Sequence, residues 1–358
     1  MTTSTATLGG RMSNSIKTLN PGYFALVMAT GIVSVGLFNN GWTLASNILL
    51  WICVIAYAVL VVLYLIRLTK YRKETVADFL NPVAAFAFFT IVAGTDVLGT
   101  RIAMEGYFNV GMVFLVVGTI LWICLGYGIP WASFFGPAQH PILKQANGTW
   151  LIWTVATQSV AVLAATLEPH FAGIQRELAI LAVCCWAIGL GIYLIVIVTL
   201  HIRLIMLKPE PADFTTPYWI SMGALAITIL AGGKITMIVE GPSVPMVNAT
   251  HQVVSAGSVL CWAVGTWLIP PILAVGYWRH FRHKIPLNYQ PPLWSMVFPL
   301  GMYAVSSDVL GGALQLPIVK AVGHWELWIA FAVWIIVFIG MLKNFTKTVL
   351  MKPAVIQQ

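Results

Sequence analysis

Ten apolar blocks run through this chain and constrain its fold more than any other feature of the sequence. Each block holds about 18 to 28 residues with few charges, and about 20 helical residues cross a bilayer core of roughly 30 Å. The blocks cover residues 21–39, 44–67, 80–98, 107–129, 149–167, 177–204, 216–233, 251–278, 291–312 and 323–345. We therefore expect an all-α integral membrane protein with ten transmembrane helices.

The composition argues against a soluble fold. Only 8 % of the 358 residues are charged and 59 % are hydrophobic, whereas a soluble domain carries roughly a quarter charged residues. Residues 1–20 are polar and lack the apolar stretch and cleavage site of a secretory signal, so we expect the first helix to be retained. This interpretation divides the chain into an N-terminal tail (1–20), a transmembrane domain (21–345) and a C-terminal tail (346–358).

Basic residues are distributed unevenly between the two sides of the predicted bundle. With a cytoplasmic N-terminus, the tails and the loops on that side hold 15 of the 19 Lys and Arg residues. The opposite side holds Arg101, Arg176, Lys234 and Lys320. This positive-inside bias predicts that both tails are cytoplasmic, in a plasma or inner membrane. It also accounts for the net charge of +8 without a nucleic-acid partner.

The apolar blocks alternate in character. The odd-numbered blocks open with a turn signal and an aromatic residue, such as NPGY at 20–23 and PPLW at 291–294, and they are rich in small and hydroxyl residues. Their starts recur about every 60 to 75 residues, which is the length of a helical hairpin. Because polar groups in hydrocarbon face protein or water, we expect five hairpins with five inner (odd) and five outer (even) helices. Close helix packing is the alternative use of the small residues.

Four segments carry a resemblance to a known family. They are NPGYFALVMATGIVSVG, NGTWLIWTVATQSVAVLAA, WAVGTWLIPPILAVGYWRH and WSMVFPLGMYAVSS. The chain resembles the tellurite-resistance/dicarboxylate transporter family, which includes bacterial tellurite-resistance permeases, fungal malate and sulfite permeases and plant slow-type anion channels. The resemblance extends from about Asn20 to Phe345. It implies a homotrimer in which each subunit has a central pore, formed by five inner helices and plugged near its middle by a phenylalanine.

The matching motif in this chain is Phe298-Pro299, so we expect Phe298 to be the pore gate. Pro299 removes one intrahelical hydrogen bond and is expected to kink its helix, which would push the preceding side chain toward the axis. An ordinary packed or lipid-facing aromatic is the alternative for Phe298. Counting six residues from each odd-helix start predicts a shared level of Val27, Phe88, Thr154, Gly223 and Phe298. Phe88 is thereby a second candidate for the plug.

Two features indicate that the pore accepts anions. The five inner helices would all have their N-termini in the cytoplasm, and parallel helix dipoles place partial positive charge at that mouth. The Lys and Arg residues of the loops raise the local concentration of anions. Hydroxyl and amide donors that could partly replace hydration, and that we expect to line the pore, are Thr30, Thr95, Thr157, Gln158, Ser159 and Ser306.

Three charged residues lie near the outer ends of the inner helices, namely Asp96, Lys234 and Asp308. We expect them to ring the outer mouth, where the lysine would hold the two carboxylates ionised. A sharper hypothesis is that Asp96 or Asp308 carries a proton and couples anion movement to the proton gradient. A structural ion pair near the interface is the alternative.

Other classes of function find less support. No nucleophile with a base and no paired carboxylates are visible, so we expect no enzymatic activity. The five cysteines and seven histidines show no metal-ligand spacing, so we expect neither a metal nor a cofactor. A membrane receptor is a weaker alternative because it has no reason to repeat small polar inner helices five times. The sequence leaves open the choice between channel and carrier, and between C4-dicarboxylates such as malate, inorganic anions, and sulfite or tellurite-type oxyanions.

Overall fold

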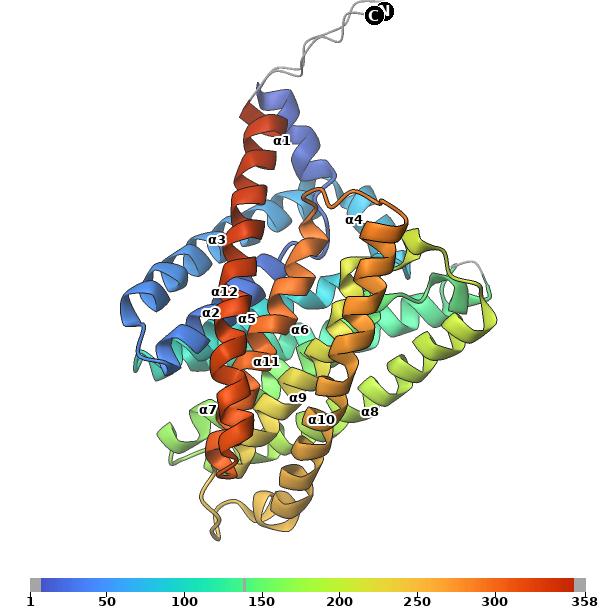
Figure 1. Cartoon of the computed structure of the whole chain (residues 1–358). Coiled ribbons are helices and arrows are strands. Elements are labelled where there is room, and N and C mark those ends of the chain that lie inside the picture. Colours follow the sequence, from blue (N-terminus) through green and yellow to red (C-terminus); the bar gives the residue numbers. More distant parts are fainter. Residues whose placement is uncertain (1–7, 138–139, 351–358) are drawn as a thin grey trace, which may run out of the picture.

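Helices make up the regular structure of residues 8–137 and 140–350, which are the residues that the computed structural model describes (Figure 1). No strand occurs in that part of the chain. Nine of its helices are long and apolar enough to cross a membrane, whereas α2 (Ala25–Asn39) is also apolar but has only 15 residues. Each of the ten predicted blocks overlaps one of these ten helices.

The ten helices form an inner and an outer set. The inner helices are α2, α5 (Thr90–Ala103), α7 (Ile152–Leu167), α9 (Ile220–Thr236) and α11 (Trp294–Ala313). The outer helices are α3 (Thr43–Lys70), α6 (Phe108–Phe135), α8 (Gln175–Met206), α10 (Pro245–Tyr277) and α12 (Pro317–Phe345). In the apolar stretches that contain α5, α7, α9 and α11, 83–89 % of the residues are buried, against 17–44 % in the outer helices. Composition therefore predicted which of these helices are the more buried.

Short 3₁₀ helices lead into four of the inner helices. They are η1 (Ala85–Phe89), η3 (Gly148–Leu151), η6 (Thr216–Trp219) and η8 (Pro291–Leu293), and their lengths differ. The third block was predicted over 80–98, but the apolar stretch that crosses the bundle there is Ala85–Ala103. The difference arises because Asn81 and Pro82 form a turn, in which the Asn81 side chain accepts a hydrogen bond from the Val83 amide.

Two polar helices lie at the same end of the bundle as the last turns of α12 (Figure 1). These helices are α1 (Leu8–Lys17) and α4 (Arg72–Leu80), and we call this end the terminal end. The Lys17 ammonium lies 3.2 Å from the Glu74 carboxylate and joins the two helices. A hydrogen bond from its own backbone amide, assisted by Lys17, lowers the pKa of Glu74. The inner helices begin at this end and run toward the opposite one, the far end.

The inner helices close into a ring. Helix α2 packs against both α5 and α11, α7 packs against α5 and α9, and α9 packs against α11. Each inner helix also packs against the outer helix that follows it in the chain. Five consecutive helix pairs therefore surround a common centre, with one inner helix of each pair at that centre.

An aromatic side chain on each outer helix is hydrogen-bonded to the inner helix of the next pair. In four of the five bonds the donor is a tryptophan indole, and the acceptor is a hydroxyl or a backbone carbonyl. The pairs are Tyr57–Thr95 (3.1 Å), Trp122–Thr157 (2.9 Å), Trp186–Thr228 (3.1 Å, carbonyl), Trp262–Ser307 (3.0 Å) and Trp334–Thr30 (3.0 Å). The last pair connects the fifth hairpin to the first. These bonds satisfy polar groups that would be costly to leave unpaired in a bilayer.

Candidate functional site

One face of each inner helix is directed toward the centre of the ring. Ile32, Val35 and Asn39 of α2 line a narrow cavity near the far end, and their i, i+3, i+7 spacing keeps them on one helix face. The other inner helices contribute Val97, Thr100 and Met104, then Ser159 and Val162, then Ile227, Leu230 and Lys234, and finally Met302, Val305 and Val309. We call this space of about 20 Å³ the far-end cavity.

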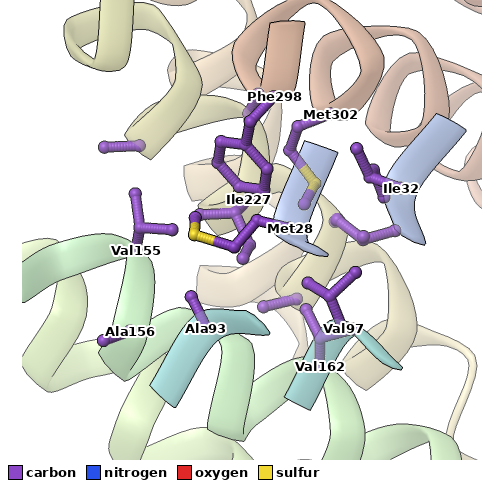
Figure 2. Close-up of a cluster of buried hydrophobic side chains, with 14 of the residues drawn as sticks. Met28, Ile32, Ala93, Val97, Val155, Ala156, Val162, Ile227, Phe298 and Met302 are labelled. Carbon is purple, nitrogen blue, oxygen red and sulfur yellow. The ribbon is translucent and has the colours of Figure 1, made fainter. Parts of the chain in front are cut away.

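An apolar layer closes the far-end cavity toward the terminal end. Stepping back four residues along each inward face gives Met28, Ala93, Val155, Gly223 and Phe298. Figure 2 shows Met28, Ala93, Val155 and Phe298 in one buried apolar cluster, together with Ile227 and Met302 of the far-end cavity. Phe298 is only 1 % exposed. We call this set the Phe298 layer.

A larger cavity of about 680 Å³ lies on the other side of the Phe298 layer, where the inner helices begin. Thr90, Ile152 and Ser295 line it and each stands three residues before a member of the Phe298 layer, so the inward faces continue into this cavity. The two cavities share no lining residue. We call this space the terminal-end cavity.

The terminal-end cavity carries an excess of positive side chains. Lys144, Arg203 and Arg279 line it together with one carboxylate, Asp213. Arg203 donates to the Tyr218 hydroxyl at 3.0 Å and lies 3.9 Å from Asp213. Arg279 donates to the Pro211 and Ala212 carbonyls. Both guanidinium groups are thus held by the protein, and the positive charge of the lining exceeds that of its carboxylate.

The loop before η8 is hydrogen-bonded to the segment that leads into α2. The hydroxyl of Tyr289 lies 3.2 Å from that of Tyr23 and accepts a hydrogen bond from the Trp294 indole, also at 3.2 Å. Burial raises the pKa of Tyr289, so its phenol stays a neutral partner in this chain of bonds. Neighbouring residues Asn288 and Gln290 line the terminal-end cavity.

Of the five residues predicted to share one level of the pore, two belong to the Phe298 layer and three do not. Val27 packs with Phe24 and Cys53 toward α3, one residue away from the inward-facing Met28. Phe88 packs against Phe79 of α4, with ring centroids 6.1 Å apart. Phe88 therefore lies outside the Phe298 layer, which corrects the expectation of a second aromatic at the plug.

Thr154 and Gly223 are the other two predicted positions, and of these Gly223 belongs to the Phe298 layer. Thr154 is fully buried and precedes the inward-facing Val155, whereas Gly223 has the phase of the Phe298 layer and lies against Pro299. The fixed offset fails because the counts start at unequal points. The count to Thr154 starts at the first residue of η3, whereas the counts to Gly223 and Phe298 start at the second residues of η6 and η8. A slip of one residue turns an α-helix by about 100° and so selects another face.

Most of the hydroxyl and amide groups predicted to line the pore face other helices instead. Thr30, Thr95 and Thr157 accept bonds from aromatic groups of outer helices. Gln158 donates to the Trp186 carbonyl of α8 at 3.0 Å, and Ser306 bonds to the Tyr303 carbonyl of its own helix. Within the lining of the two cavities, Ser159 is the member of this predicted set that is present.

Residues that the polarity argument missed line the cavities: Asn39 and Thr100 at the far end, Thr90, Ser221 and Ser295 at the terminal end. Met28 and Met302 flank Phe298 but have no polar group to mark them (Figure 2). The sequence signal that could have identified these far-end and layer residues is their spacing: positions i, i+4, i+7 and i+11 lie on one face of an inner helix.

The three charged residues predicted to ring the outer mouth do not come together. Asp96 is fully buried and accepts a hydrogen bond from the Ser159 hydroxyl at 2.8 Å, on the side of α5 that meets Gly118 of α6. The Asp308 backbone packs beside Gly323 of α12. Of the three, Lys234 alone lines the far-end cavity, and among the described residues no carboxylate lies within ion-pair distance of it. This arrangement corrects the expectation of a shared ring.

Comparisons with known proteins agree with the architecture. A family model described as voltage-dependent anion channel matches residues 18–342, which include all five inner helices. An uncharacterized membrane protein of Mycobacterium tuberculosis is 49 % identical over 147 residues, which are 41 % of this chain and 73 % of that protein. Two uncharacterized transporters of Methanocaldococcus jannaschii are each 25 % identical, over 93 % and 90 % of this chain and 96 % and 92 % of their own lengths.

Proposed function

Because this chain belongs to the SLAC1 family, whose description is voltage-dependent anion channel, we propose that it passes small anions across a membrane through its own ring of inner helices. The observation that carries the proposal is the alignment of two cavities along the inward faces, separated by the Phe298 layer. The two archaeal relatives are named as transporters, which points to transport and not to catalysis.

In this proposal Phe298 is the gate. Its ring stands at the layer between the cavities and is surrounded by apolar side chains (Figure 2), so an ion meets a dry constriction there. Pro299 follows it inside α11, where a proline removes one backbone hydrogen bond and weakens the helix locally. A shift of this segment, or a rotation of the ring, would join the two cavities.

We further propose that all ten helices cross the membrane, with both tails in the cytoplasm of a plasma or inner membrane. The distribution of basic residues supports this orientation, and it places the terminal-end cavity, with Lys144, Arg203 and Arg279, at the cytoplasmic mouth. Helix dipoles add partial positive charge at the same mouth. A homotrimer with one pore in each subunit, as the family resemblance implies, completes the proposal.

Flux measurements in proteoliposomes test the function and the gate together. We expect Phe298→Ala to raise the flux of permeant anions above that of the native protein, because it removes the ring that separates the cavities. Phe88→Ala is the matched control, since it makes the same chemical change outside the layer. A panel of chloride, nitrate, sulfite, malate and tellurite would identify the substrate class. Equal flux in folded Phe298→Ala and native protein would refute the gate, and no flux of any anion in either would refute the function.

A proton-coupled carrier is a second candidate, and the position of Asp96 favours it. This carboxyl is fully buried with no cation within ion-pair distance among the described residues, and its partner Ser159 lines the far-end cavity. Intramembrane carboxyl groups in such positions commonly carry protons. Uptake measured across a pH series would test it with Asp96→Asn and Asp308→Asn. An unchanged pH dependence in both variants would remove proton coupling.

A further inference from the structure

The far-end cavity carries one unbalanced positive charge. Lys234 lies near the end of α9, and it is the one charged side chain among the described residues that line this cavity. The two carboxyl groups that could have neutralised it face elsewhere, since Asp96 bonds to Ser159 beside α6 and Asp308 is not among the lining residues. An ammonium group without a counter-charge in a narrow space attracts an anion.

The cavity also offers hydrogen-bond donors at its far end. The Ser159 and Thr100 hydroxyls already donate to Asp96, so the donors that remain in the lining are the Asn39 amide and the Lys234 ammonium. Hydroxyl and amide groups can replace part of the hydration shell of an ion. An anion that enters the far-end cavity would therefore exchange part of its water for the Asn39 amide and the Lys234 ammonium.

The rest of the wall is hydrocarbon and thioether, which limits the charge that the site accepts. A singly charged anion beside Lys234 forms a neutral pair. A doubly charged anion leaves one negative charge uncompensated against side chains such as Val35, Leu230 and Val305, and an uncompensated charge in an apolar environment is strongly disfavoured.

We propose that Lys234, with Asn39, forms an anion-binding site in the far-end cavity that holds one singly charged anion beyond the Phe298 layer. The proposal rests on the proposed function, because it gives the path a binding step on the far side of the gate. It makes Lys234 a specificity-determining residue that favours singly over doubly charged anions.

Chemical modification tests binding without any transport. The full-length protein in detergent is treated with formaldehyde and dimethylamine borane, which are both uncharged, and methylation of each lysine is followed by mass spectrometry. We expect sodium nitrate to slow methylation of Lys234 at least threefold, and sodium sulfate at equal ionic strength to slow it less. Lys320, exposed at the same end of the bundle and outside the cavity, is the internal control. Equal protection of both lysines, or none at Lys234, would overturn the site.

Flux in the Phe298→Ala background supplies a second measurement, because the apolar layer then no longer limits passage. We expect Lys234→Gln to raise the nitrate concentration for half-maximal flux at least fivefold and to reduce the preference for nitrate over sulfate. Lys234→Arg keeps the charge and should restore both, whereas a purely structural lysine would not be replaced by arginine with recovery of selectivity. Lys320→Gln should change neither quantity.

The two measurements separate the two proposals. Protection of Lys234 by nitrate without flux in any variant would overturn the proposed function and leave the binding site standing. Flux without protection, and with unaltered selectivity in Lys234→Gln, would overturn the binding site and leave the proposed function standing.

Discussion

Replacement of Gly223 by alanine should favour the open state of the proposed gate, because it forces α9 and α11 apart beside Phe298. Gly223 of α9 lies against α11, and a Cβ atom built there would be 2.7 Å from Pro299 Cγ, 2.9 Å from its Cβ and 3.1 Å from its Cα. Carbon atoms pack best at roughly 3.5–4.0 Å, so the two helices must separate by about 1 Å to admit the methyl group. Pro299 is a rigid neighbour because its ring is closed on the backbone, and the residue before it is Phe298.

The size of the effect follows from overpacking. An extra methyl group in a packed core costs roughly 1–3 kcal/mol. If opening relieves the whole of this cost, the equilibrium between closed and open states shifts by roughly 5 to 150-fold. We expect Gly223→Ala to increase anion flux in proteoliposomes within that range, without reaching the flux of Phe298→Ala, and to lower the thermal unfolding midpoint in detergent.

Gly312→Ala is the matched control because it lies on α11 and a Cβ there would meet nothing within 4 Å. Both substitutions gain the same helix propensity, which is roughly 1 kcal/mol in favour of alanine. The difference between the two variants therefore isolates the contact with Pro299. If Gly223→Ala matches Gly312→Ala in both flux and unfolding midpoint, the reasoning from the Gly223–Pro299 contact is refuted.

Two further predictions concern polar contacts within the bundle. Trp334→Phe removes the indole that donates to Thr30 and should lower the free energy of unfolding by about 1 kcal/mol. Trp325 is 72 % exposed, so Trp325→Phe should leave the free energy of unfolding unchanged. Equal losses in the two variants would contradict the bond between hairpins. Asp96→Asn keeps a side chain that can bond to Ser159, so its free energy of unfolding should stay within about 1 kcal/mol of that of the native protein. Asp96→Ala leaves a buried space and should lower the free energy of unfolding by roughly 1–3 kcal/mol. Denaturation in detergent measures both variants, and equal stability would show that the bond contributes nothing.

The length and alternation of the apolar blocks were enough to predict the class of the fold and the inner and outer sets of helices. A bilayer fixes the length of a spanning helix, and the absence of water inside it forces small and hydroxyl residues toward protein. Phe298 was singled out from the sequence because the Phe-Pro motif carries the family resemblance, and its role as a gate stays a prediction. These features are local, so each can be recognised without knowing what the helix touches.

Which face of an inner helix points to the centre was decided by the tertiary structure. An inner helix is buried all round, so polarity no longer indicates a direction: Thr30 and Thr157 turn outward because indoles of neighbouring outer helices supply their hydrogen bonds. The phase of each inward face depends on the residue at which the helix begins, and the composition sets that start only to within a residue or two. For the same reason the sequence grouped Asp96 with Lys234, whereas packing between α5, α6 and α7 buried the carboxyl and left the ammonium in the cavity.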